Sequence, residues 1–314
     1  MIGLYHKILV PLDGSTLAEQ VLPHLQRLAT PADTTFVLVT VINSGTYVAT
    51  HSRYLPPDYF IRLRADAEAY IAAQRQQLAQ AGFRVEAYVG DGDAAGNILQ
   101  IAATTQADLI AMTTHGRAGF IRWALGSVAE RIVSETALPV FLARATTALP
   151  SDQVRRILVP LDGSALAEQA LPIAGALAKT TGAELLLLQV IQPLDDRNQD
   201  ILFKDAAEAQ AAFAEWRANA EAYLHEKAQP FQAVGVPCRY KVELADVAPT
   251  IIDTAGSEPV DLLVMSTHGH SGLRRWVYGS VTNKVLRGVT CPLLLIHQAA
   301  TVSQKPYPVN QGNN

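Results

Sequence analysis

The sequence predicts an α/β protein made of two tandem doubly wound domains, each a five-stranded parallel sheet flanked by helices. Its 314 residues are enough for about two domains of roughly 150 residues each. The segment Ile8-Leu-Val-Pro-Leu-Asp-Gly-Ser15 recurs letter for letter as Ile157-Leu-Val-Pro-Leu-Asp-Gly-Ser164, which indicates a duplicated domain. Short apolar runs alternate with helical patterns in each half, as expected of parallel strands joined by right-handed helical crossovers.

The first half begins with a predicted strand over residues 7–11, and Ser15 is expected to cap a helix that runs to about residue 29. Residues 35–42 are apolar or β-branched and predict a strand buried on both faces. A long helix is expected over about 58–81, with Gly82 following its C-cap. The further elements are a strand over 84–89, a loop over 90–93, a helix to 105, a strand over 109–112, a glycine-bearing loop, a helix over 127–133 and a last strand over 139–144.

The second half repeats this order and is longer, with its additional residues between Val190 and Tyr223. Pro230 lies inside its long helix and predicts a kink or an early stop near Gln229, because proline removes a hydrogen bond and clashes with the preceding turn. We place the first domain at residues 1–147 and the second at 155–299. Residues 300–314, rich in Pro, Gln and Asn, are expected to form a disordered tail.

The composition excludes several classes of protein. Hydrophobic residues make up 49% of the chain and charged residues 17%, which is typical of a globular protein with a large core. A net charge of −4 argues against a nucleic-acid partner, which favours a basic surplus. No apolar run approaches the roughly 18 residues of a membrane span. The two cysteines, Cys238 and Cys291, fit a reducing compartment better than a disulfide, so we predict a cytoplasmic protein.

A glycine-spaced stretch occurs once in each half. It reads Met112-Thr-Thr-His-Gly-Arg-Ala-Gly-Phe-Ile-Arg-Trp-Ala-Leu-Gly-Ser-Val128 in the first and Met265-Ser-Thr-His-Gly-His-Ser-Gly-Leu-Arg-Arg-Trp-Val-Tyr-Gly-Ser-Val281 in the second. Each copy follows a predicted buried strand and precedes a helical pattern. A strand, glycine loop and helix in this order direct free backbone N–H groups and the positive end of a helix dipole at one point. A phosphate group is the expected occupant.

The residues of the stretch support this interpretation. Its glycines lack a Cβ and let the backbone approach a ligand, and Ser127 and Ser280 take the positions expected of helix N-caps. The arginines, Arg117, Arg122, Arg274 and Arg275, suit bidentate phosphate contacts. The alternative is a tight turn with an ordinary N-cap and solvated arginines. The second copy of the pattern favours a phosphate site over that alternative.

The pattern of a small residue, two residues, Gly, nine residues and Gly-Ser resembles the nucleotide-binding signature of the universal stress protein family. The family has Gly at the first position, where this chain has Thr113 and Ser266. The resemblance covers most of the chain as two tandem domains. It implies an adenine nucleotide alpha-hydrolase-like fold that binds ATP (or ADP or AMP) with Mg²⁺ accompanying the phosphates. It also implies that the fifth strands, here 139–144 and 292–297, pair in an intramolecular pseudo-dimer, with a further homodimer possible.

Each half has one aspartate just after its first strand, Asp13 in the first half and Asp162 in the second. Ligands of doubly wound sheets bind beyond the carboxyl ends of the strands, and a carboxylate there can accept hydrogen bonds from an adenine amino group or a ribose hydroxyl. The alternative is that each aspartate only turns the chain in Asp-Gly-Ser. The resemblance favours the adenosine role and places Val41 and Val190 against the base.

The candidate nucleotide-binding residues occur in both halves. They are Pro11, Leu12, Asp13, Ser15, Val41, Met112, Thr113, His115, Gly116, Arg117, Gly119, Gly126, Ser127 and Val128 in the first half, and Pro160, Leu161, Asp162, Ser164, Val190, Met265, Ser266, His268, Gly269, Gly279, Ser280 and Val281 in the second. The histidines contact phosphate or a metal in one interpretation and only fix their loops in the other, which we favour.

The loop after the third strand differs between the halves, because Gly90 and Gly92 give way to Glu243 and Leu244. A bulkier and acidic loop is expected to crowd or repel a nucleotide, so the first site is the stronger prediction.

The function predicted is that of an ATP-binding stress sensor or regulator with little or no catalysis. The chain has no Gly-x-x-x-x-Gly-Lys-Ser/Thr, no nucleophile elbow and no His-Glu-x-x-His pair, and nothing supplies a clear general base. Two alternatives stay open: a scaffold that binds protein partners and no nucleotide, and a weak ATPase that uses Asp13 or Asp162.

Overall fold

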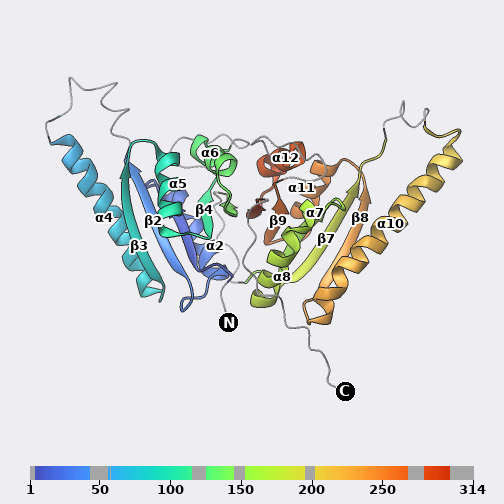
Figure 1. Ribbon diagram of the computed structural model, residues 1–314, viewed down its shortest axis with the longest axis horizontal. Helices are drawn as coiled ribbons and strands as arrows, with labels where there is room; N and C mark the ends of the chain where they lie inside the picture. Colours follow the sequence, from blue (N-terminus) through green and yellow to red (C-terminus); the bar gives the residue numbers. More distant parts are fainter. Residues whose placement is uncertain are drawn as a thin grey trace, which may run out of the picture.

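The computed structural model describes residues 4–42, 56, 58–114, 125–144, 153–194, 202–267 and 279–297. Within these ranges the strands form one ten-stranded sheet (Figure 1), in the order β3-β2-β1-β4-β5-β10-β9-β6-β7-β8. The strands are β1 (Lys7–Pro11), β2 (Thr35–Ile42), β3 (Arg84–Asp91), β4 (Leu109–Thr113), β5 (Val140–Ala143), β6 (Arg156–Leu161), β7 (Glu184–Ile191), β8 (Cys238–Leu244), β9 (Leu262–Ser266) and β10 (Leu293–Ile296). The strands within each half are parallel, and the predicted fold class is confirmed.

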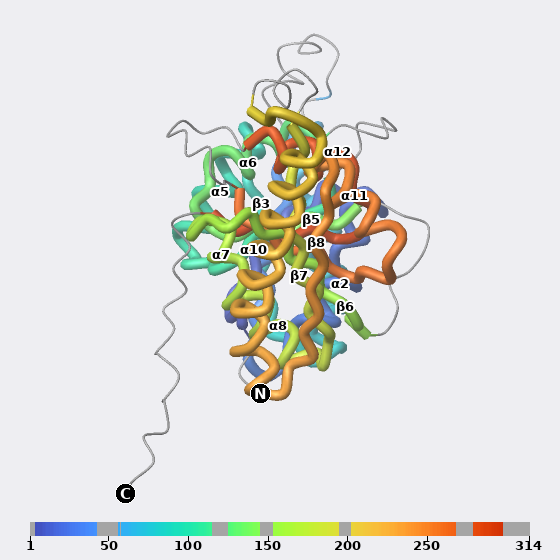
Figure 2. Tube along the Cα trace, turned by 90° about the vertical axis from the view of Figure 1, so that its right-hand side faces the viewer, coloured from blue at the N-terminus to red at the C-terminus, as the bar shows by residue number. Residues whose placement is uncertain are grey.

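Helices cover both faces of the sheet (Figure 1). They are α1 (Thr16–Glu19), α2 (Val21–Leu28), α4 (Tyr59–Gln80), α5 (Ala94–Thr105), α6 (Ser127–Glu135), α7 (Ala165–Glu168), α8 (Ala170–Thr181), α10 (Ala206–Ala233), α11 (Val247–Ser257) and α12 (Ser280–Gly288). The long helices α4 and α10 lie outermost, at the two ends of the sheet (Figure 1), and α10 runs lengthwise over β7 and β8 in the perpendicular view (Figure 2).

The strand order reverses at the same place in both halves. In the first half β1 lies between β2 and β4, and in the second β6 lies between β7 and β9. Successive crossovers therefore leave from opposite sides of β1 and of β6, which opens a crevice at the carboxyl ends of these strands. The sequence predicted this crevice between the first and fourth strands, and the pairing confirms it.

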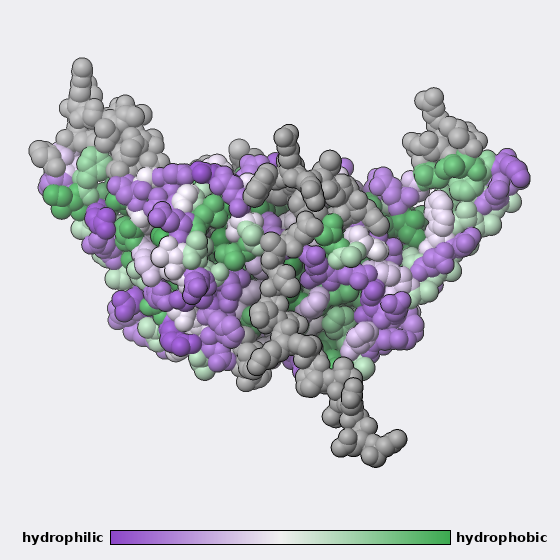
Figure 3. All heavy atoms as spheres, in the orientation of Figure 1, coloured by the Kyte–Doolittle hydropathy of each residue, from purple (hydrophilic) through white to green (hydrophobic). Residues whose placement is uncertain are grey.

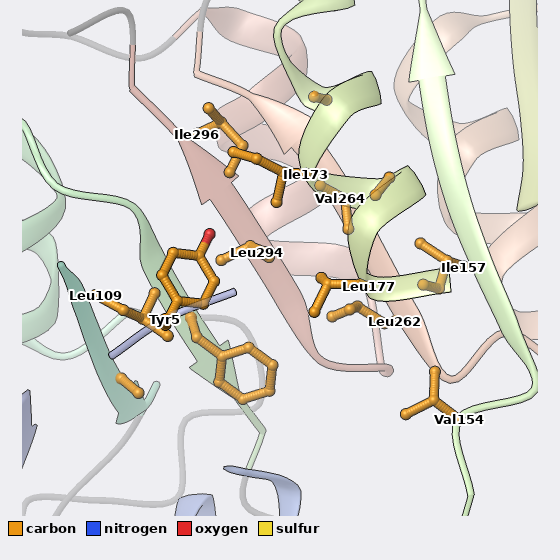
Figure 4. Packing of buried hydrophobic residues seen from close by; sticks show 14 of the residues in the cluster. Tyr5, Leu109, Val154, Ile157, Ile173, Leu177, Leu262, Val264, Leu294 and Ile296 are labelled. Carbon is orange, nitrogen blue, oxygen red and sulfur yellow. The ribbon is translucent and has the colours of Figure 1, made fainter. Parts of the chain in front are cut away.

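The two halves join through their last strands. The strands β5 and β10 pair antiparallel, with Phe141 opposite Leu294, as predicted for the fifth strands. Both side chains are at most 1% exposed, and burying a side chain of this size contributes about 1.5–3 kcal/mol. Figure 4 shows Leu294, Ile173, Leu177 and Tyr5 converging where the halves meet. The pairing also removes two exposed sheet edges.

Two element boundaries differ from the prediction in the first half. The helix after Ser15 is interrupted at Gln20 and continues as α2, because Pro23 has no N–H to donate to the carbonyl of Glu19. The strand β3 extends through Gly90 and Asp91, which were predicted to lie in a loop but pair with Val41 and Ile42. A Cβ at Gly90 would lie 2.6 Å from the Asn97 amide oxygen, so a larger residue here would require the Asn97 side chain on α5 to move.

Pro230 does not end its helix, since α10 continues to Ala233. The early stop near Gln229 was wrong because packing holds the last turn in place, and the kink given as its alternative stays a prediction. The ring of Phe231 lies so close to Gly175 that a Cβ on Gly175 would come within 2.3 Å of it. Gln232 also donates a hydrogen bond to the Cys238 carbonyl at 2.9 Å.

Hydrophilic residues interrupt the hydrophobic ones over the face in Figure 3. Exposed large hydrophobic side chains include Ile61 and Leu202, near the starts of the long helices. None of the helices in the described ranges is long and apolar enough to cross a membrane. The predicted tail at 300–314 lies outside the described residues.

Candidate functional site

Each half contains a cavity at its strand crevice. The first has a volume of about 260 Å³ and the second about 290 Å³. The first is lined by Pro11, Leu12, Asp13, Ala18, Val39, Val41, Ala94, Ile98, Met112, Thr113, Thr114, Gly126, Ser127, Val128 and Ala129. The second is lined by Pro160, Leu161, Asp162, Ala167, Leu188, Val190, Val247, Ile251, Met265, Ser266, Gly279, Ser280, Val281 and Thr282. Segments far apart in the sequence thus meet at equivalent places in the two halves.

The aspartate at the end of the first strand both turns the chain and lines the cavity. Asp13 Oδ1 accepts hydrogen bonds from the Ser15 N–H at 3.0 Å and the Ser15 hydroxyl at 2.5 Å. Gly14, between them, has φ of 80°, a conformation that strongly favours glycine. Asp162 and Ser164 repeat the arrangement at 3.0 and 2.6 Å. The turn and the ligand-facing position are therefore compatible, and neither interpretation excludes the other.

The serine that follows each aspartate caps a helix. Ser15 Oγ accepts from the Ala18 N–H at 3.1 Å, and Ser164 Oγ accepts from the Ala167 N–H at the same distance. These predicted N-caps are confirmed. Neither serine is among the residues that line the cavities, so their contribution is to fix the turn that holds the aspartate.

The helices α6 and α12 direct their amino ends at the cavities. Their N-caps are Gly126 and Gly279, one residue earlier than predicted, so Ser127 and Ser280 lie in the first turn instead. Neither N-cap makes a side-chain hydrogen bond, because glycine has no side chain to donate or accept. A helix amino end without a side-chain cap is a favourable place for an anion.

A hydrogen bond fixes the approach to each of these helices. The Gly126 N–H donates to the Thr114 carbonyl at 2.9 Å, and the Gly279 N–H donates to the Thr267 carbonyl at 3.2 Å. A Cβ at Gly126 would lie 3.3 Å from the Thr114 carbonyl oxygen. A larger side chain at this position would therefore crowd the wall of the cavity.

Thr113 and Ser266, which replace the expected glycine, are both buried and both line their cavities. The structure also brings in residues that sequence reasoning missed, notably Ala94 and Ile98 on α5 and Val247 and Ile251 on α11. Each pair lies one helical turn apart, on the helix that follows the third strand. Their spacing is a signal for a shared face, but which face meets the crevice depends on the crossover geometry.

Several candidates of the glycine stretch lie outside the described residues. These are His115, Gly116, Arg117, Gly119, His268 and Gly269, together with the arginines Arg122, Arg274 and Arg275.

A tyrosine and a glutamate lie beside each aspartate turn. The Tyr70 hydroxyl donates to Glu19 at 2.9 Å, and the Tyr223 hydroxyl donates to Glu168 at 3.0 Å. Burial, the glutamate hydrogen bond and the nearby negative charges raise the pKa of both phenols well above the usual range. Both hydroxyls are therefore protonated donors that tie the long helices to the short helices α1 and α7.

The loop after the third strand does not crowd the second cavity. Glu243 forms an ion pair with Lys241 at 2.9 Å and is absent from the described residues that line the cavity. Leu244 pairs with Ile191 as Asp91 pairs with Ile42, so Leu244 corresponds to Asp91 and not to Gly92 as predicted. The second cavity is no smaller than the first, and the expected difference between the sites has no structural support here.

No group of three or more His, Cys, Asp or Glu side chains that could hold a metal occurs in the part of the chain that the structure describes. Cys238 and Cys291 are buried free thiols. Burial raises the pKa of Cys238 to about 11 and that of Cys291 to about 12, so neither is a thiolate at neutral pH.

These observations define an α/β protein of doubly wound halves, each with a ligand-sized crevice where its strand order reverses. A model of the universal stress protein family matches residues 4–144 and again residues 153–297. The chain belongs to the universal stress protein family and carries that domain twice in tandem.

Individual relatives agree with this assignment. A universal stress protein of Thermus aquaticus is 32% identical over 143 residues, which cover 45% of this chain and 98% of the relative. One of Mycobacterium tuberculosis is 26% identical over 202 residues, 63% of this chain and 65% of the relative. The crystal structure of a universal stress protein from Archaeoglobus fulgidus superposes with a TM-score of 0.69 at 22% identity, over 93% of this chain and 98% of that one. This last likeness shows the fold alone.

Proposed function

We propose that this protein binds an adenine nucleotide, ATP in the first instance, in the crevices of its two halves and acts as a stress-response sensor or regulator. The observation that carries the proposal is the pair of equivalent cavities, each with apolar walls, an aspartate, and a helix amino end without a side-chain cap. Volumes of about 260 and 290 Å³ are close to the lower end of the range for small-molecule pockets.

The apolar walls suit a purine. In the first cavity Val39, Val41 and Ile98 offer a surface on which a base can be buried, and Leu188, Val190 and Ile251 do the same in the second. The carboxylates of Asp13 and Asp162 can accept hydrogen bonds from an amino group or ribose hydroxyl. A cavity that combines apolar walls with a few convergent polar groups is the usual design of a ligand site.

The phosphates are assigned to the other end of each cavity. The amino ends of α6 and α12 offer backbone N–H groups and a partial positive charge, with Ser127 and Ser280 in the first turn. The loop residues Gly116 and Arg117 are proposed to complete the first site. Mg²⁺ is proposed to bind mainly to the phosphate oxygens, because no acidic cluster among the described residues would hold it alone.

The pairing of β5 with β10 supports a further part of the proposal. One chain would take the place of a dimer of single-domain proteins, as an intramolecular pseudo-dimer that works in the cytoplasm.

The test of ligand identity is to extract small molecules from freshly purified, non-denatured protein and to weigh them by mass spectrometry. Recovery of an adenine nucleotide supports the proposal, even where less than one molecule is recovered per chain. If no nucleotide is recovered, and none is retained when the protein is dialysed against millimolar ATP, the proposal is wrong.

Thr113 and Ser266 support a second candidate, a scaffold that acts through protein partners without a nucleotide. Both side chains are buried in the cavity wall where the family signature has glycine. A Gly126→Val variant that blocks the first cavity but leaves the protein's function in cells intact would favour the scaffold. Weak ATPase activity through Asp13 is tested by phosphate release, where equal rates for the wild type and Asp13→Ala exclude it.

A further inference from the structure

A third cavity exists in the first half, away from the proposed nucleotide sites. It has a volume of about 300 Å³ and lies between α1–α2 and α4. Its lining includes Glu19, several glutamine side chains, and the apolar residues Leu22 and Leu78. No basic residue is found among the described residues that line it. An acidic side chain thus lines a groove whose other polar side chains are the Thr16 hydroxyl and neutral glutamine amides.

The second half shows what the same glutamate binds. Glu168, which corresponds to Glu19, accepts the Tyr223 hydroxyl at 3.0 Å and the Lys227 ammonium at 3.1 Å. The Lys227 ammonium also lies 5.4 Å from the centroid of the Tyr223 ring, within reach of a cation–π interaction. The hydrogen bond from Lys227 to Glu168 raises the pKa of Lys227, so this lysine carries its charge. Glu168 and Tyr223 thus form a binding site for the primary ammonium group of Lys227.

The first half has the same glutamate and tyrosine, Glu19 and Tyr70, but no lysine at the position of Lys227. The Tyr70 hydroxyl donates to Glu19 at 2.9 Å, which matches the distance in the second half. The position of Lys227 is taken by Gln74, a buried neutral residue that lines the groove. At this position the first half therefore has no lysine side chain that could bring an ammonium group to Glu19.

The two halves also differ in the side chains at the position of the groove. In the second half Phe231 packs against Gly175, so closely that a Cβ on Gly175 would lie 2.3 Å from the ring. Leu78 and Gln26 occupy the corresponding positions in the first half, and both line the groove. The aromatic ring that packs on a glycine in the second half has no counterpart in the first, where two other side chains line the groove instead.

We propose that this groove binds a small primary alkylammonium ion, with its charged end at the Glu19 carboxylate and its alkyl chain along Leu22 and Leu78. An ammonium group has three donors, which the Glu19 carboxylate and the amide oxygens of Gln26, Gln74 and Gln77 can accept. The alkyl chain replaces water along the apolar walls. The site is separate from the proposed nucleotide crevices, and its test uses no nucleotide.

The experiment titrates the full-length protein with n-pentylammonium chloride at neutral pH, followed by ligand-observed NMR, with n-pentanol as the uncharged control. We expect a dissociation constant of about 1 mM, since a ligand of few atoms has limited binding energy. Pentanol is expected to bind at least about tenfold more weakly, because it lacks the charge that pairs with Glu19.

Three variants separate the proposed site from nonspecific binding. Glu19→Gln removes the charge, and Gln74→Lys supplies the ammonium from the chain as the second half does. Each is expected to weaken pentylammonium binding at least about tenfold, the loss of one charge-assisted contact. Glu168→Gln, the matched change in the second half, is expected to leave binding unchanged. Equal binding of the amine and the alcohol, unchanged binding in Glu19→Gln or in Gln74→Lys, or an equal loss in Glu168→Gln would each overturn the proposal.

Discussion

The two halves of this protein have nearly the same crevice and differ in how their helices pack away from it. The aspartate turns, the glycine N-caps and the cavity volumes are nearly the same. The packing around the helices α2 and α4 of the first half differs from that around α8 and α10 of the second. Where the second half buries Ile173 and packs Phe231 on Gly175, the first half buries His24 and leaves an open groove. The features common to both halves support one kind of ligand for both crevices. The features found in one half predict that the halves differ in stability and in binding outside the crevices.

The largest expected difference is in acid stability, because His24 occupies the position that Ile173 takes in the second half. Burial, with the nearby charge of Arg27, lowers the pKa of His24 to about 4. A histidine held neutral stabilises the folded state above its unfolded pKa of about 6.5, and this contribution is lost as pH falls through 6.5 toward 4. His24→Leu should therefore remove a pH-dependent loss of about 3 kcal/mol.

Urea unfolding at a series of pH values between 7 and 4 measures this loss for the wild type and the variant. Ile173→Leu in the second half is the control and should leave the pH profile unchanged. Parallel profiles for the wild type and His24→Leu would show that the histidine is not held neutral.

The next effect comes from packing at the long helices. Gly175→Leu should destabilise the protein by about 2 kcal/mol, since there is no space for its side chain beneath Phe231. The matched change Gln26→Leu, at the open groove of the first half, should alter stability by less than about 0.5 kcal/mol. Thermal unfolding compares the two variants with the wild type, and equal shifts would contradict the difference in packing.

The smallest effect concerns the ammonium itself. Lys227 is paired with Glu168, and its pKa is raised, so the pair stabilises the fold below the unfolded lysine pKa and is lost as pH rises above it. Lys227→Gln should cost about 0.5 kcal/mol or less at neutral pH, because the pair is partly exposed to solvent. The difference from the wild type should disappear in unfolding measurements at strongly alkaline pH. A difference that grows there would mean that the pair is not what holds Lys227.

Much of the fold could be predicted because its signals are local. Residues 7–11 and 35–42 were assigned with the bounds observed for β1 and β2, since strands buried on both faces are almost wholly apolar. Gly82 was expected to end α4, and its φ of 90° agrees. The first helix was not expected to break at Gln20, although Pro23 supplied the signal.

Where the prediction failed, the cause is contact between distant segments. The predicted early stop at Pro230 was overridden by packing of Phe231 on Gly175, a glycine 56 positions earlier in the chain. The loop at Gly90 is strand because its neighbour β2 continues alongside. Among the residues that line the first cavity, Asp13 and Met112 were named from motifs, whereas Ile98 was missed because only the crossover brings its helix to the crevice.

The most direct test of the central claim is the number of ATP molecules bound per chain, measured by equilibrium dialysis with radiolabelled ATP. The wild type should retain two, and Gly126→Val or Gly279→Val should each retain one, because a side chain at either N-cap intrudes on its own cavity only. Circular dichroism should show both variants folded. No retention by the wild type at millimolar ATP, or unchanged retention in both variants, would contradict the account.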